Sequence, residues 1–178
     1  SISSIKKILT VGNDIWIISN GATDAAGAWK TTNYGSSWSQ YTKSQGLPSN
    51  VVNDIFITDD KKIWLATSKG ICMSESGGTS WKTIDNFGLK GEPMSILVIN
   101  ENLVISGTTK GIYKHTEGKL WDQLGAKLDV NVESLSLMGD AIFAGTEKGL
   151  AKSNVSKLNH WNMIGGPSIV KFIYIDKS

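Results

Sequence analysis

The sequence has no arginine, and all eighteen of its basic residues are lysines. Arginine is the usual residue for bidentate recognition of carboxylates and phosphates, so its absence disfavours sites built on arginine clusters. The single cysteine, Cys72, excludes an intrachain disulfide and any site that needs several cysteines. The two histidines, His115 and His160, do not share a metal-ligand spacing. We therefore expect no metal site and no cofactor.

Strong charge and long apolar runs are also missing. The 178 residues carry a net charge of +2, which is too small to predict a nucleic-acid partner. No apolar run approaches the ~18 residues of a membrane span, so we expect no membrane insertion. The chain opens on Ser1 without a charged and then apolar leader, which is typical of a mature or excised segment.

What the chain does contain is an internal repeat. Four tryptophans recur at intervals of 43, 40 and 40 residues, at Trp38, Trp81, Trp121 and Trp161. A second motif, Thr, any residue, Lys, Gly and an aliphatic residue, places Lys69, Lys110 and Lys148 at intervals of 41 and 38 residues. Two markers in fixed phase predict structural repeats of about 40 residues.

Within each repeat the apolar residues alternate with a period of two, as in "VVNDIFIT" and "KIWLAT". This period, together with β-branched and aromatic residues between turn residues, is typical of short strands. Four such strands per repeat predict the blade of a β-propeller. The predicted fold is all-β, a propeller or partial propeller with four complete four-stranded blades, at about 4–42, 51–85, 94–124 and 132–164.

The segment "SIVKFIYIDKS" repeats the first-strand pattern a fifth time and predicts an extra strand over 169–175. Two explanations remain open. Either the parent chain continues into further blades, or this strand completes a neighbouring molecule. We treat 1–178 as one propeller segment.

Two family resemblances follow from these residues. "GLPSNVVNDIFITDDKKIWLATSKGI" (46–71) resembles the two-component regulator propeller repeat, with Ala66 where that family has glycine. "TTNYGSSW" (31–38) and "SESGGTSW" (74–81) resemble the Asp-box or BNR repeat, with Asn33 and Ser76 in place of its aspartate. The second resemblance rests on Thr31, Asn33, Gly35, Trp38, Ser74, Ser76, Gly78 and Trp81, and blades three and four keep only Trp121 and Trp161. Propellers of this kind include sialidases, other glycosidases, photosystem assembly factor-like proteins and extracytoplasmic sensors.

We interpret the Asp-box residues as structural. A hairpin turn in which a polar side chain binds backbone N–H groups and glycine takes a positive φ accounts for them. A phosphate loop would instead need a helix after the glycines, and "WKTI" is typical of a strand. The recurring tryptophans are expected to pack in each blade. Trp29 falls outside the repeat and is the better candidate for a ligand contact.

Catalysis is not indicated by any signature. The sialidase carboxylate site implied by the resemblance needs arginines, which the chain lacks. Glycosidases need two carboxylates at a set separation, and the candidates are Asp24, Asp54, Asp59, Asp60 and Glu147. These are also common turn residues. A segment of a glycoside-hydrolase propeller therefore remains an alternative.

One constellation points to binding. Lys69, Lys110 and Lys148 all fall in the turn between the second and third strands, so propeller symmetry predicts them around one rim, and in blade one the insert "NGATDAAGA" (20–28) with Asp24 takes that place. Like charges on one rim suit an anionic or polyhydroxylated ligand. Exposed lysines also serve solubility.

These observations lead to one function and two alternatives. The leading hypothesis is a non-catalytic binding or interaction domain, which the resemblances place in the extracellular space or periplasm. The alternatives are the glycosidase segment and a purely structural repeat module. The expected partners are a carbohydrate, another anionic ligand or a protein, and a homo-oligomer is a further expectation.

Overall fold

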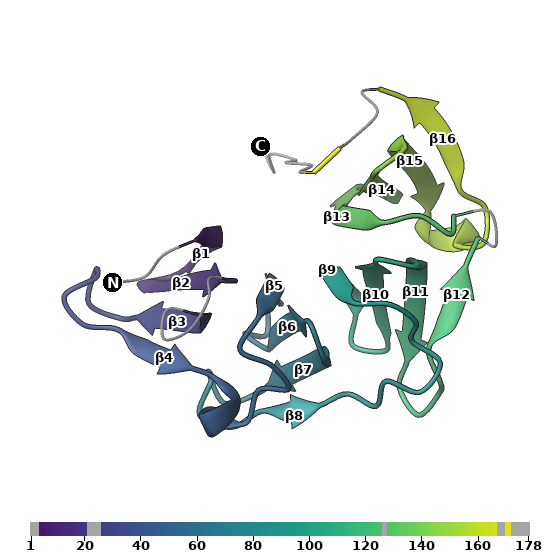
Figure 1. Cartoon of the computed structure of the whole chain (residues 1–178). Coiled ribbons are helices and arrows are strands. Elements are labelled where there is room, and N and C mark those ends of the chain that lie inside the picture. The colour runs from purple at the N-terminus through teal and green to yellow at the C-terminus, as the bar shows by residue number, and fades with distance from the viewer. Residues whose placement is uncertain (1–3, 21–25, 126–127, 167–169, 172–178) are drawn as a thin grey trace. The chain divides into compact units, whose positions relative to one another are not determined.

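The computed structural model describes residues 4–20, 26–125, 128–166 and 170–171. These residues form four antiparallel sheets of four strands each, and in every sheet the strands follow one another in chain order (Figure 1). The predicted all-β fold with four meandering sheets is confirmed. The chain divides into two compact units, Ser1–Asp85 and Asn86–Ser178, and each holds two sheets.

The first unit contains blades 1 and 2. Blade 1 consists of β1 (Ile5–Val11), β2 (Asp14–Ser19), β3 (Gly27–Thr31) and β4 (Ser39–Tyr41). A short 3-10 helix, η2 (Lys43–Gln45), connects it to the next blade. Blade 2 consists of β5 (Val52–Ile57), β6 (Ile63–Thr67), β7 (Gly70–Ser74) and β8 (Lys82–Thr83).

The second unit contains blades 3 and 4. Blade 3 consists of β9 (Pro93–Asn100), β10 (Leu103–Thr108), β11 (Gly111–Thr116) and β12 (Asp122–Leu124). Blade 4 consists of β13 (Val132–Met138), β14 (Ala141–Thr146), β15 (Gly149–Asn154), the 3-10 helix η3 (Val155–Lys157) and β16 (Asn162–Gly165). Most of the predicted extra strand 169–175 lies outside the described residues. Of that segment, Val170 donates a backbone hydrogen bond to the Thr146 carbonyl at 3.0 Å.

The core of the first unit lies between its two blades. One cluster contains residues of both blades: Trp16, Ile18, Ala28, Leu47, Val52, Ile55, Ile63, Leu65 and Cys72. Leu9 packs against this cluster from β1. Successive residues of a strand point to opposite faces, so the neighbouring Ile8 lies on the other face of blade 1, where 56% of its surface is exposed. The period-two pattern thus gives blade 1 apolar residues on both faces.

Small residues on the second strands allow blades to pack closely. A Cβ atom on Gly107 of β10 would lie 2.6 Å from the Val132 side chain of the next blade, which is closer than non-bonded atoms approach. A Cβ atom on Gly145 of β14 would likewise lie 3.0 Å from Cγ1 of Val170. Blade 2 has Ala66 at this place. The glycine of the repeat is therefore explained in blade 3 by contact with Val132 of the following first strand, and in blade 4 by contact with Val170.

Candidate functional site

The turns that carry the three lysines are built by threonine and glycine. In blade 2 the Thr67 hydroxyl accepts from the Lys69 N–H at 3.3 Å and donates to the Gly70 carbonyl at 2.7 Å. Thr108 and Thr146 make the same pair of bonds in blades 3 and 4. All three threonines are fully buried, and the glycines Gly70, Gly111 and Gly149 have φ of 130°, 110° and 114°. The backbone of these turns is thus satisfied without a lysine side chain.

The lysine side chains themselves face solvent. Lys69, Lys110 and Lys148 are all exposed. Within the described residues, Lys110 and Lys148 form no ion pair. Both belong to the second unit, whereas Lys69 belongs to the first.

Contacts within the second unit place the Lys110 and Lys148 turns at the same end of their blades. The Gly107 end of β10 contacts Val132 at the start of β13. The adjacent Asn131 carbonyl accepts from the Glu147 N–H at 3.1 Å, which ties the start of β13 to the turn of Lys148. The two ammonium groups therefore contribute positive potential to one end of this unit.

Blade 1 differs at the corresponding turn. Asp24 and most of the insert 20–28 lie outside the described residues. Near the end of the insert, Gly27 has a positive φ of 115°, and the turn glycines of the other blades also have positive φ. Trp29 lies in β3, opposite Ile17 of β2 and Gln40 of β4, and is half-buried. It is thus a residue of the sheet and the third residue of β3.

The two Asp-box-like segments form turns with the same hydrogen bonds. In the first, the Thr31 hydroxyl accepts from the Gly35 N–H at 3.0 Å, and the Asn33 carboxamide accepts from the Ser37 N–H at 2.9 Å. Gly35 has φ of 89°. These bonds satisfy the turn without a ligand.

In the second turn serines make the equivalent contacts. The Ser74 hydroxyl accepts from the Gly78 N–H at 2.9 Å, and the Ser76 hydroxyl accepts from the Ser80 N–H at 2.9 Å. A Cβ atom on Gly78 would lie within 3.0 Å of Tyr41 and Trp16 of blade 1. This turn therefore packs on the neighbouring blade.

The recurring tryptophans contact the segment that follows the fourth strand of the preceding blade. Trp81 packs on Gly46 and Tyr41, and Trp161 packs on Gly125. The Trp121 N–H donates to the Phe87 carbonyl at 2.9 Å. Trp121 is buried, while Trp38, Trp81 and Trp161 are half-buried.

The carboxylates named from the sequence occupy ion pairs and turns. Asp54 is buried and binds Lys7 at 2.7 Å. Asp59 and Asp60 lie in the exposed turn between β5 and β6, and Glu147 is exposed beside Lys148. A hydrogen bond from the Thr58 hydroxyl and contact with Lys62 hold the pKa of Asp60 below its usual value. Among the described residues no group of three His, Cys, Asp or Glu side chains could hold a metal ion.

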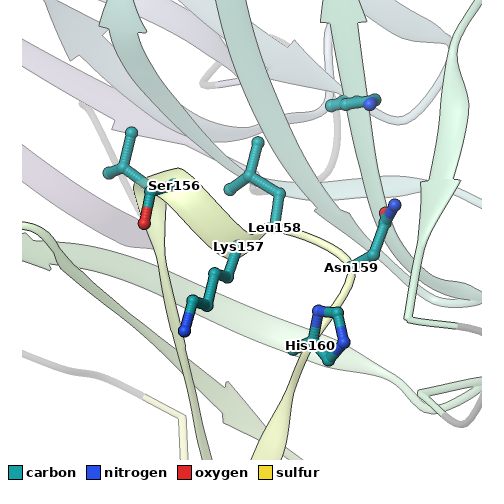
Figure 2. Close-up of a pocket in the computed structure, with 7 residues that line it drawn as sticks. Ser156, Lys157, Leu158, Asn159 and His160 are labelled. Carbon is teal, nitrogen blue, oxygen red and sulfur yellow. The ribbon is translucent and has the colours of Figure 1, made fainter.

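One pocket was missed from the sequence. A hollow of about 350 Å³ is lined by Lys114 of β11 and by residues 155–160, which connect β15 to β16 (Figure 2). The sequence signal was the spacing from the strand-opening glycine to the tryptophan, which is eleven residues in blades 1 and 2 and twelve from Gly149 to Trp161.

The comparisons with known proteins agree with this architecture. Residues 46–69 match the family model described as two component regulator propeller. A comparison with curated protein sequences found no match. None of the helices among the described residues is long and apolar enough to cross a membrane.

Solved propeller structures resemble nearly the whole chain. The extracellular domain of a B. thetaiotaomicron protein assigned as a hybrid two component system matches 98% of this chain and 25% of its own, with 19% identity and a TM-score of 0.79. An ancestral GH74 enzyme matches 92% and 24%, with 22% identity and a TM-score of 0.70. YCF48 bound to D1 peptide matches 86% and 50%, with 17% identity and a TM-score of 0.63. These similarities show a β-propeller fold, and the chain spans about a quarter of the first two structures.

Proposed function

We propose that the chain is a non-catalytic binding segment of an extracytoplasmic β-propeller, and that the turns of Lys69, Lys110 and Lys148 contribute to binding. The observation that carries this proposal is that different residues of these turns supply the hydrogen bonds and the charge. Buried threonines and positive-φ glycines supply the hydrogen bonds and the conformation of these turns, while the Lys110 and Lys148 side chains are exposed and form no ion pair with the described residues. Side chains that the turn itself does not use, as those of Lys110 and Lys148, are available for a ligand.

The ligand class follows from the chemistry of the side chains. Ammonium groups donate charge-assisted hydrogen bonds to carboxylate, sulfate and phosphate oxygens. The proposed ligand is therefore an anionic or polyhydroxylated carbohydrate, or an acidic segment of a protein. A propeller of similar fold is bound to a peptide, which supports a protein partner as well.

The test is a triple substitution of the three lysines by glutamine. Binding of polygalacturonate and dextran sulfate is measured by calorimetry, with neutral dextran as the reference. Loss of binding to the polyanions in this variant, and its retention when the exposed lysines Lys43, Lys82 and Lys119 are replaced instead, is the expected result. Equal loss in both triple variants would show a general charge effect and overturn the assignment of the rim.

The location and the lack of catalysis are tested separately. The extracytoplasmic proposal rests on the similarity to extracellular sensor domains, and recovery of the native protein in the cytoplasmic fraction of its host would contradict it. The Asp-box-like turns are proposed to be structural, because their hydrogen bonds close within the turn. The release of reducing ends from any polysaccharide of the panel would favour the glycosidase alternative.

The outer face of blade 1 supports a second proposal, the binding of another blade. Val52 and Ile55 of blade 2 are fully buried by packing against blade 1. The residues at the same places in β1, Ile5 and Ile8, are 49% and 56% exposed. We propose that, in a preparation of the 178-residue chain, a blade of a second copy covers them.

Sedimentation equilibrium tests this association. The wild-type chain is expected to self-associate, and the variant Ile5→Lys/Ile8→Lys is expected to be monomeric. Tyr34→Lys, at another exposed apolar residue, serves as the control. A wild-type chain that stays monomeric at about millimolar concentration would remove this proposal and leave the ligand proposal unaffected.

A further inference from the structure

The connection between β15 and β16 of blade 4 departs from the turns of blades 1 and 2. Ser153 stands at the place of Thr31 and Ser74, four residues after the glycine that opens the third strand. Thr31 and Ser74 each accept a hydrogen bond from a glycine N–H four residues away in a tight turn. The Ser153 hydroxyl instead donates to the carbonyls of Lys157, at 3.1 Å, and His160, at 2.8 Å. It thereby closes a wider loop.

Hydrogen bonds to its backbone N–H groups fix the conformation of this loop. The Asn154 side chain caps η3 by accepting from the Ser156 N–H at 2.9 Å. The His160 N–H donates to the Lys157 carbonyl at 2.9 Å, and the Val155 N–H donates to the Asp140 carbonyl, which fastens the loop to the turn between β13 and β14. The side chains of Lys157 and His160 remain exposed. A fixed backbone with free polar side chains is what a binding loop requires.

Lys114 of blade 3 completes the pocket. In Figure 2 the Lys157 and His160 side chains extend to one side of the loop and the Leu158 side chain extends to the other. None of the seven lining residues carries a carboxylate, and two of them carry an ammonium group. Lys114 contacts Asp122 at 3.5 Å, which is longer than a close charge-assisted hydrogen bond of about 2.8 Å. The ammonium of Lys114 can therefore bind a further anion.

We propose that this pocket is a second binding site, and that its ligand is a hydroxylated anion of monosaccharide size. The carboxylate or phosphate of the ligand is bound by Lys114 and Lys157. The imidazole of His160 and the carboxamide of Asn159 are available for the hydroxyl groups. The Ser156 hydroxyl donates to the Asn154 carboxamide at 2.8 Å and can accept from the ligand. A hollow of about 350 Å³ lies at the lower end of the range for small-ligand pockets, about 300–1,000 Å³.

The site is independent of the lysine rim. The turn of Lys148 precedes β15 and the loop 155–160 follows it, so the two lie at opposite ends of the same strand. Substitutions at one end leave the other intact. Failure of the pocket proposal is therefore distinguishable from failure of the rim proposal.

Nuclear magnetic resonance of the histidine rings provides a direct test. The chain has two histidines, and His115, stacked on Trp121 at 5.1 Å and outside the pocket lining, is an internal reference. D-glucuronate, glucose 6-phosphate and glucose are titrated to about 10 mM, which detects millimolar affinity, at constant ionic strength. The expected result is a saturable shift of the His160 signal with either anion or both, no shift with glucose and a constant His115 signal. A response to only one anion identifies carboxylate or phosphate as the recognised group.

Substitutions assign the response to the pocket. Lys114→Gln/Lys157→Gln is expected to weaken binding at least about tenfold, since a hydrogen bond to a charged group contributes about 1.5–3 kcal/mol. Lys119→Gln, an exposed lysine of blade 3 outside the pocket, is expected to change nothing. Asp122→Asn removes the carboxylate that competes for Lys114 and is expected to tighten binding. The proposal is overturned by an absence of any saturable shift, or by equal effects of the pocket variant and Lys119→Gln.

Discussion

The ammonium of Lys7 lies 2.7 Å from the carboxylate of Asp54 and connects the first strands of blades 1 and 2. Lys7 also donates to the Ile55 carbonyl at 3.0 Å, and the Asp54 carboxylate accepts from the Ile55 N–H at 2.8 Å. The Asp54 side chain is 12% exposed and that of Lys7 is 38% exposed. The carboxylate of this pair is thus more enclosed than that of Asp60 in its pair with Lys62, which is 47% exposed.

Lys7→Met is expected to lower the free energy of unfolding by about 1–2 kcal/mol, because it removes the ammonium partner of a nearly buried carboxylate. The partial exposure of Lys7 keeps the loss below that of a fully buried pair. Urea unfolding measures the change. Lys7→Met/Asp54→Ser should recover part of the stability, since serine stands at the equivalent places 95 and 134. Lys62→Met is the control and should cost less than about 0.5 kcal/mol; an equal loss in both would contradict the argument.

Gly107→Ala is expected to destabilise the second unit by about 1–3 kcal/mol. The added methyl would meet the Val132 side chain and the Ser95 hydroxyl. Gly107→Ala/Val132→Ala should be closer to wild type than the sum of the two single variants predicts, because the alanine at 132 makes room for the new methyl. Additive effects in denaturant unfolding would show that the two residues do not share this contact. Gly139→Ala is unsuited as a control because of its φ of 56°, and Ala141→Gly serves instead.

Thr108→Val and Lys110→Gln are expected to have opposite consequences for fold and function. The Thr108 hydroxyl is buried, accepts from the Lys110 N–H at 3.0 Å and donates to the Lys90 carbonyl at 2.8 Å. Its replacement should cost about 1–3 kcal/mol, because the partners lose their hydrogen bonds inside the protein. Lys110→Gln should leave the free energy of unfolding unchanged within about 0.5 kcal/mol. A destabilised Lys110→Gln would remove the argument that the lysine is free for a ligand.

The fold could be predicted because its signals are local and repeated. The strands coincide with runs of alternating or continuous apolar residues, as in β6 (Ile63–Thr67) and β5 (Val52–Ile57). Repetition makes the strand prediction more reliable, because a weak pattern in one blade is supported by the equivalent segments of the others. The contact of Gly107 with Val132 was beyond prediction, because it depends on how one blade packs on the next.

The candidate sites were harder to predict for two physical reasons. Lys110 and Lys148 could be placed in equivalent turns from their motif, but the role of their threonines appears only in the hydrogen bonds. The pocket of Lys114 and His160 joins residues of two blades that are 46 positions apart. No motif marks it, because its loop is defined by departure from the repeat.

Cys72 is expected to resist alkylation in the native protein. The thiol is fully buried, and burial raises its pKa to about 12. The thiolate is the reactive form, so at pH 8 both the lack of access and the lack of charge protect it. Iodoacetamide labelling followed by mass spectrometry should proceed only at the rate at which the protein opens, and rapidly in denaturant. Fast labelling of a folded sample would contradict the burial of this side chain.

The same thiol should make stability depend on pH in alkaline solution. Its pKa rises from 9.0 to about 12 on folding, so above pH 9.0 the unfolded chain releases a proton that the native chain retains. The contribution is therefore fully present below pH 9.0 and decreases as the pH rises toward 12. For one group the slope approaches about 1.4 kcal/mol per pH unit. Lysines and tyrosines titrate in the same range, so the measured quantity is the difference in unfolding free energy between wild type and Cys72→Ala at pH 8 and at pH 10. We expect wild type to lose stability relative to the variant over this interval, and a constant difference would show that the thiol does not titrate differently in the two states.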